Sequence, residues 1–196
     1  MTRLRPAPHH VCRTDNPSID FVHDERWRRA ALLPVTCCMA DAPLNAKLPL
    51  DPDGVYAFLT DLDFLPQWYP AVRRISVRGG GPPTLGARLV EHRRAPLVPG
   101  MRIVVPMQVT DARAGVRYAV RAWFPRTCSI DASYELEPSL DEVGTFVRVR
   151  YEVEPMTRAA LPACRAIGWV LATQGRAQVA AMPRGLAAWR GEPSGE

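Results

Sequence analysis

The sequence lacks the long apolar run that a membrane-spanning helix requires. No segment of the 196 residues approaches about 20 consecutive apolar residues. The pattern of a secretory signal is also missing, because the first apolar stretch, residues 30–35, follows a charged segment and is interrupted by Pro34. We therefore expect a protein without a membrane span.

Cysteine and histidine are too few and too scattered for a disulfide framework or a metal centre. The chain has 5 cysteines and 4 histidines. No cysteine pair has the C-x-x-C spacing of a metal or redox site, and an odd number of thiols is not typical of a disulfide framework. The expected location is therefore the reducing cytoplasm, and we expect no metal ion and no other cofactor.

Common catalytic and phosphate-binding motifs are missing as well. The chain has no G-x-S-x-G nucleophile motif. Its glycine triplet, Gly79–Gly81, precedes a predicted strand, so it lacks the helix N-terminus that binds phosphate groups. We interpret this triplet as a turn.

Lysine is nearly absent, since Lys47 is the only lysine among 25 basic residues. With 20 acidic residues, the net charge is +5. On three consecutive predicted strands, the charged residues share the solvent face, and opposite charges pair across antiparallel strands. Because such pairing neutralises much of the arginine, we expect no nucleic-acid partner. The acidic strand carries Asp131, Glu135 and Glu137, and its neighbours carry Arg117, Arg121, Arg148 and Arg150.

Residues 1–39 differ from the rest of the chain. They contain three of the four histidines, clustered arginines and scattered prolines, but no hydrophobic periodicity. We predict a poorly ordered N-terminal extension over 1–39, followed by one domain over 40–192.

The domain begins with a predicted strand and two short helices. Residues 44–50 alternate with a period of two, as in a strand. Asp51 is suited to cap a helix that starts at Pro52, and its apolar stripe continues to Leu62. A second short helix is predicted over 63–68.

Six further strands and one long helix complete the pattern. The strands are predicted over 72–77, 86–92, 101–109, 116–124, 128–136 and 145–153, with a turn over 111–115. Their alternation indicates an antiparallel sheet with one covered face. Apolar residues at spacings of three and four from Ala160 to Trp189 predict the covering helix, which Pro162 and Pro183 are expected to interrupt.

Four segments in this order carry a family resemblance: residues 50–61 (LDPDGVYAFLTD), 65–70 (LPQWYP), 85–88 (LGAR) and 144–151 (GTFVRVRY). Together with the order of elements, they resemble the START-like or SRPBCC superfamily, which includes polyketide cyclases and dehydrases, lipid-transfer domains and Bet v 1-like proteins. The resemblance covers about residues 43–190. It implies the α+β helix-grip fold, in which a curved antiparallel seven-stranded sheet wraps around a long C-terminal helix, with two short helices after the first strand.

The resemblance further implies an apolar cavity between the sheet and the long helix. The alternation of the strands and the periodicity of the helix then predict which residues line that cavity. Aromatic and methionine side chains among them suit a hydrophobic ligand. The predicted ligand-binding residues are Trp68, Met101, Ile103, Met107, Tyr118, Val120, Ile130, Tyr134, Val149, Tyr151, Ile167 and Leu171.

The strand over 86–92 leaves two alternatives for a general acid or base inside the cavity. Glu91 points inward if Leu89 does, whereas His92 points inward if Val90 does. Inward tyrosines on later strands supply further hydroxyl groups. The candidate catalytic residues are therefore Glu91 or His92, with Tyr134 and Tyr151.

Three functions stay open on this basis. The first hypothesis is a domain that binds a small hydrophobic molecule, lipid-like or aromatic. The second is an enzyme that resembles polyketide cyclases and aromatases and uses the same cavity, and the third is an interaction module with a filled core. An inward carboxylate, histidine or arginine would favour the enzyme, a wholly apolar cavity the carrier, and the lack of a cavity the module.

Overall fold

The computed structural model describes residues 38–39, 44–69, 71–95, 100–140 and 143–192. All of them belong to one compact unit that starts at Val35. Of the predicted N-terminal extension, residues 1–37 lie outside the described ranges, and Cys38–Met39 form a short strand.

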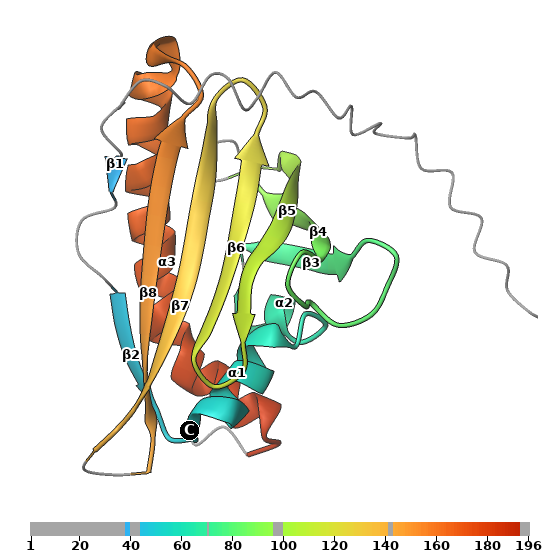
Figure 1. Cartoon of the computed structure of the whole chain (residues 1–196), viewed down its shortest axis with the longest axis vertical. Coiled ribbons are helices and arrows are strands. Elements are labelled where there is room, and N and C mark those ends of the chain that lie inside the picture. Colours follow the sequence, from blue (N-terminus) through green and yellow to red (C-terminus); the bar gives the residue numbers. More distant parts are fainter. Residues whose placement is uncertain (1–37, 40–43, 70, 96–99, 141–142, 193–196) are drawn as a thin grey trace, which may run out of the picture. The chain divides into compact units, whose positions relative to one another are not determined.

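An antiparallel sheet with seven strand positions forms the body of this unit, as predicted (Figure 1). Its order is β1-β8-β7-β6-β5-β4-β3, and β2 also pairs with β8. The segments β1 and β2 follow one another along β8 and together occupy the first position. The strands are β1 (Cys38–Met39), β2 (Leu44–Leu48), β3 (Val72–Val77), β4 (Arg88–Arg94), β5 (Arg102–Arg113), β6 (Arg117–Phe124), β7 (Cys128–Pro138) and β8 (Thr145–Pro155).

Alternation along the strands separates a covered face from a solvent face. It is clearest in β8, where Val147, Val149 and Val153 are fully buried and their neighbours are not. The predicted turn over 111–115 starts too early, because β5 continues to Arg113. A bulge between Val109 and Asp111 shifts the register there and breaks the simple period-two pattern.

Two short helices follow β2. Helix α1 (Pro52–Thr60) begins as predicted, because an Asp51 side-chain oxygen accepts a 2.7 Å hydrogen bond from the Gly54 N–H. Helix α2 (Leu65–Trp68) lies next along the chain. The ring of Trp68 packs on Phe58 with 5.0 Å between ring centroids, so these helices share one aromatic cluster.

The long helix α3 (Leu161–Trp189) follows a short 3-10 turn, η2 (Arg158–Ala160), and lies against the covered face. Figure 1 shows it running beside β7 and β8, while β3 and β4 cross the direction of those strands, so the sheet curves around the helix. Pro162 lies in the first turn, where a missing N–H costs no helical hydrogen bond. Helix α3 also continues through Pro183, so neither proline divides it.

Glycine lets α3 approach the sheet at one point. A Cβ atom on Gly175 would lie 2.6 Å from Leu44 Cδ1 and 2.8 Å from Tyr151 Cε2. A Cβ atom on Gly168, two turns earlier, would meet nothing within 4 Å. Close packing therefore explains Gly175 but not Gly168.

The charged solvent face contains the predicted cross-strand pairs. Arg121 donates two hydrogen bonds, of 2.8 and 2.7 Å, to Asp131. Arg148 and Arg150 each lie 3.7 Å from Glu135. The prediction of arginines on both sides of an acidic strand is confirmed. No helix in the described ranges is long and apolar enough to cross a membrane.

Candidate functional site

A cavity of about 240 Å³ lies between α3 and strands β4 to β7. Most of its wall is apolar and comes from both sides, and the lining residues with polar side chains are Arg93 and Gln174. A single polar corner therefore faces an otherwise hydrophobic space. The apolar lining comprises Ile103, Phe124, Ile130, Ile167, Val170 and Leu171, with Ala163 and Ala166.

The face that each residue of β4 presents to α3 determines which charged side chains reach this cavity. Leu89 and Glu91 are buried, with 1% and 7% exposure, whereas His92 is exposed. The first of the two parity alternatives is therefore the observed one, and it also brings Arg93 to the cavity wall.

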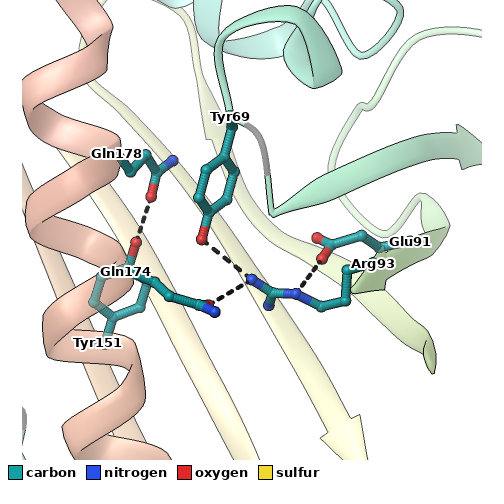
Figure 2. Close-up of polar contacts among 6 residues, drawn as sticks. All are labelled: Tyr69, Glu91, Arg93, Tyr151, Gln174 and Gln178. Atoms are coloured by element: carbon teal, nitrogen blue, oxygen red, sulfur yellow. Dashed lines mark hydrogen bonds and ion pairs between the residues drawn. The ribbon is translucent and has the colours of Figure 1, made fainter. Parts of the chain in front are cut away.

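Arg93 is the centre of a polar cluster (Figure 2). Its Nη2 donates hydrogen bonds to Gln174 Oε1, at 2.9 Å, and to Tyr69 OH, at 3.2 Å. Its Nε lies 3.2 Å from Glu91 Oε1 and forms an ion pair with it. We call Tyr69, Glu91, Arg93 and Gln174 the Arg93 cluster. It joins β4, the end of α2 and α3.

Burial controls the electrostatics of this cluster. The side chains of Glu91 and Arg93 are only 9% and 12% exposed. Desolvation raises the pKa of Glu91, and the nearby Arg93 offsets this only in part. Burial alone would lower the pKa of Arg93, but Glu91 and Tyr69 outweigh it and the pKa is raised. Arg93 therefore stays charged, whereas Glu91 takes up a proton more readily than an exposed carboxylate does.

A second polar group links two tyrosines to α3. The hydroxyl of Tyr151 donates a 2.6 Å hydrogen bond to Gln178 Oε1, and Gln178 Nε2 donates a 3.0 Å bond to Tyr134 OH. Burial raises the pKa of Tyr134 to about 12 and that of Tyr151 well above 10. Both hydroxyls are therefore neutral at pH 7 and serve as hydrogen-bonding groups, not as bases.

Eleven of the twelve predicted ligand-binding residues divide into two groups. Four of the twelve line the cavity, from β5, β7 and α3: Ile103, Ile130, Ile167 and Leu171. Seven others pack in the core outside the cavity wall: Trp68, Met107, Tyr118, Val120, Tyr134, Val149 and Tyr151.

Three placements differ from the predictions. Met101 is 50% exposed, because β5 begins only at Arg102. Trp68 does not line the cavity but packs against α3, with its side chain next to Gly185. His92 lies on the solvent side of β4, which removes it from the candidate acids and bases.

Six of the ten lining residues were not among the predicted ligand-binding residues, although three of the six had a sequence signal. Phe124 continues the inward parity of Tyr118 and Val120 along β6. Gln174 lies on the inward stripe of α3, seven residues after Ile167, where a polar side chain among apolar ones marks a functional position. The inward position of Arg93 follows from that of Leu89, but the sequence left open which face of this strand points inward.

No cluster of three or more His, Cys, Asp or Glu residues suited to a metal ion occurs in the part of the chain that the structure describes. Cys128 and Cys164 are both buried, and the Cys164 Sγ donates a 3.6 Å hydrogen bond to the Thr127 carbonyl oxygen.

The sequence matches a known protein family. A family model described as "Polyketide cyclase / dehydrase and lipid transport" matches residues 40–188. The chain belongs to this family. Among curated proteins, no sequence is significantly similar to it.

Solved structures share the fold of this family member at low sequence identity. The di-domain ARO/CYC protein StfQ from the steffimycin biosynthetic pathway superimposes with a TM-score of 0.61, at 14% identity, over 78% of this chain and 52% of that chain. Ara h 8.0201 gives a TM-score of 0.58 at 14% identity, over 75% and 97% of the two chains. Norcoclaurine synthase from Thalictrum flavum gives 0.54 at 13% identity, over 79% and 88%.

Proposed function

We propose that this protein binds a small hydrophobic molecule in the cavity between α3 and the sheet. The observation that carries this proposal is the apolar wall around about 240 Å³, interrupted only at one corner by Arg93 and Gln174. An apolar protein cavity of about 150 Å³ binds benzene. The larger cavity is therefore suited to two fused aromatic rings or a lipid-like chain of similar volume.

Two further points support the proposal. The family description names lipid transport together with polyketide cyclases and dehydrases. Lipids and the ring systems that polyketide cyclases form are largely hydrophobic. The match over 40–188 supports our assignment of the function to a domain over 40–192. Transfer of apolar ligand surface from water supplies roughly 25 cal/mol per Å².

The first experiment is native mass spectrometry of the purified protein, followed by denaturing extraction of any bound compound. Equilibrium dialysis with 2-acetylnaphthalene then measures binding directly. Replacing Ala166, an exposed residue of α3 that lines the open side of the cavity, by tryptophan should obstruct the space and weaken binding by at least about tenfold. Ala177→Trp is the matched control, because Ala177 is exposed on the same helix and outside the lining. No bound compound and no binding by the unmodified protein would favour the interaction module.

A second candidate function is catalysis of a ring closure, and the buried Glu91 beside Arg93 favours it. StfQ is described as an ARO/CYC protein. In an intramolecular aldol condensation, Arg93 would stabilise the enolate oxygen, and Glu91, which does not line the cavity, would accept the proton from the carbon α to one carbonyl through one water molecule. The new carbon–carbon bond forms at the second carbonyl carbon, whose oxygen takes up the first proton. Loss of a second proton from the same α carbon, with transfer of a proton to that oxygen, then releases water and leaves the ring double bond.

A simple diketone tests this second candidate. Conversion of 2,6-heptanedione to 3-methylcyclohex-2-enone and water should be faster with the protein than without it, and Glu91→Gln should abolish the difference. Glu152→Gln, on the exposed side of β8, should leave the rate unchanged. Equal rates with and without the unmodified protein would contradict the enzymatic function for this substrate class and leave the binding function standing.

A further inference from the structure

The polar corner of the cavity offers mainly hydrogen-bond donors. The guanidinium of Arg93 has no acceptor atom. Gln174 has one, Oε1, and one of its two lone pairs already accepts from Arg93 Nη2. Within the described chain, the N–H groups of Arg93 Nη1 and of Gln174 Nε2 have no hydrogen-bond partner. A ligand that fills the cavity therefore satisfies more of this corner with an acceptor than with a donor.

The positive charge of that corner is already balanced. The Glu91 carboxylate lies 3.2 Å from Arg93 Nε, and both side chains are buried. The other members of the Arg93 cluster, Tyr69 and Gln174, are uncharged. A ligand carboxylate would add a second negative charge to one guanidinium that is only 12% exposed, which costs free energy. An uncharged carbonyl accepts the same hydrogen bonds without adding charge.

We propose that Glu91 is a specificity-determining residue, which makes the cavity accept hydrophobic ligands that end in an uncharged carbonyl and reject those that end in a carboxylate. This inference rests on the proposed binding function, because it concerns the same cavity. Glu91 itself does not line the cavity and acts through Arg93. Its carboxylate balances the Arg93 guanidinium, so the polar corner that a ligand contacts carries no net charge.

Two ligands of matched shape test the inference. The compounds 2-acetylnaphthalene and 2-naphthoate share one ring system and differ in a methyl ketone against a carboxylate. Equilibrium dialysis at neutral pH, where naphthoate is ionised, gives both dissociation constants. The unmodified protein should bind the ketone at least about tenfold more tightly, because the carboxylate would be buried beside Glu91.

Substitution of Glu91 should change this preference. Glu91→Gln keeps the shape of the side chain and leaves Arg93 with an unbalanced positive charge. Naphthoate should then bind at least about tenfold more tightly than before, while the affinity for the ketone should change by less than about threefold. Glu152→Gln, an exposed substitution on β8, should leave both dissociation constants unchanged.

A second variant keeps the test decisive if Glu91→Gln does not fold. Arg93→Gln retains the carboxylate and removes the cation, so it should weaken naphthoate binding further and increase the preference for the ketone. A folded Glu91→Gln protein with an unchanged preference, or a folded Arg93→Gln protein that binds naphthoate better, would overturn the inference while ketone binding persists. Failure of both ligands to bind the unmodified protein is a different result, since it contradicts the binding function itself.

Discussion

Arg93 on β4 and Gln174 on α3 are joined by a 2.9 Å hydrogen bond, although 81 positions separate them in the sequence. The bond attaches the covering helix to the sheet at the wall of the cavity. The residues that give the cavity its polar corner therefore also hold two elements of the fold together. Changes at this site should affect stability as well as binding.

Gln174→Leu should destabilise the protein. The substitution removes the acceptor for Arg93 Nη2 and leaves a buried charged donor with one partner fewer. Hydrogen bonds to charged groups contribute about 1.5–3 kcal/mol, so the free energy of unfolding in urea should fall by that amount. Thr173→Ala on the exposed side of α3 should change it by less than about 0.5 kcal/mol. Equal effects of the two substitutions would show that the Arg93 bond contributes nothing.

Two glycines of α3 should respond in opposite directions to alanine. Gly168→Ala adds a Cβ atom in open space and should raise the free energy of unfolding by about 0.5–1 kcal/mol, because alanine favours the helix. Gly175→Ala places the same atom against Leu44 and Tyr151 and should lower it by about 1–3 kcal/mol. Urea unfolding of both variants measures the difference. Shifts of the same sign would contradict the close approach at Gly175.

Glu91 should make stability depend on pH. Its pKa in the folded protein is raised above the ordinary value of 4.5 by burial, with Arg93 as the opposing influence and Tyr69 and Tyr134 as its other titratable neighbours. The folded state therefore holds the proton to higher pH than the unfolded state does. Between pH 4.5 and the raised pKa, stability falls as pH rises, and above that pKa this effect is constant.

The slope of stability against pH tests this assignment. Urea unfolding of Glu91→Gln at a series of pH values above 4.5 should show a flatter profile than that of the unmodified protein. The profile of Glu152→Gln should keep the original slope. If Glu91→Gln retained the original slope, the dependence would belong to other groups.

Cys128 and Cys164 should be unreactive in the native protein. Both thiols are buried, and burial raises the pKa of Cys128 to about 12. Because the thiolate is the reactive form, a disulfide reagent such as DTNB should modify neither residue until the chain unfolds in guanidinium. A variant with serine at positions 12, 37 and 38 isolates these two thiols. Rapid modification of that variant under native conditions would contradict their burial.

The fold was predictable because its signals are local. Alternation along β8 shows the covered face within eleven residues, and Asp51 followed by Pro52 marks the start of α1 with two adjacent residues. The bulge after Val109 was not predictable, because the parts of β5 before and after it each keep a regular alternation. Pro183 was misleading for a related reason, because packing along the whole length of α3 outweighs one missing hydrogen bond.

The polar corner of the cavity was harder to predict than the fold. Leu89 and Val90 are adjacent and both apolar, so the parity of β4 was undetermined. Only the register with β5, in which Arg93 pairs with Ile103, places Glu91 inside and His92 outside. The partners of Arg93 come from α2 and α3, and no local pattern connects segments so distant in the sequence.

A carbonyl group bound at the donor corner would lie in the electric field of a guanidinium and an amide N–H. Such donors draw electron density toward the carbonyl oxygen, which lowers the stretching frequency of the C=O bond and makes its carbon more electrophilic. The infrared spectrum of a bound ketone would therefore report the reactivity that the corner imposes on it. Binding a carbonyl compound in this cavity would therefore also activate its carbonyl carbon toward a nucleophile, which is the first requirement for catalysis of a ring closure.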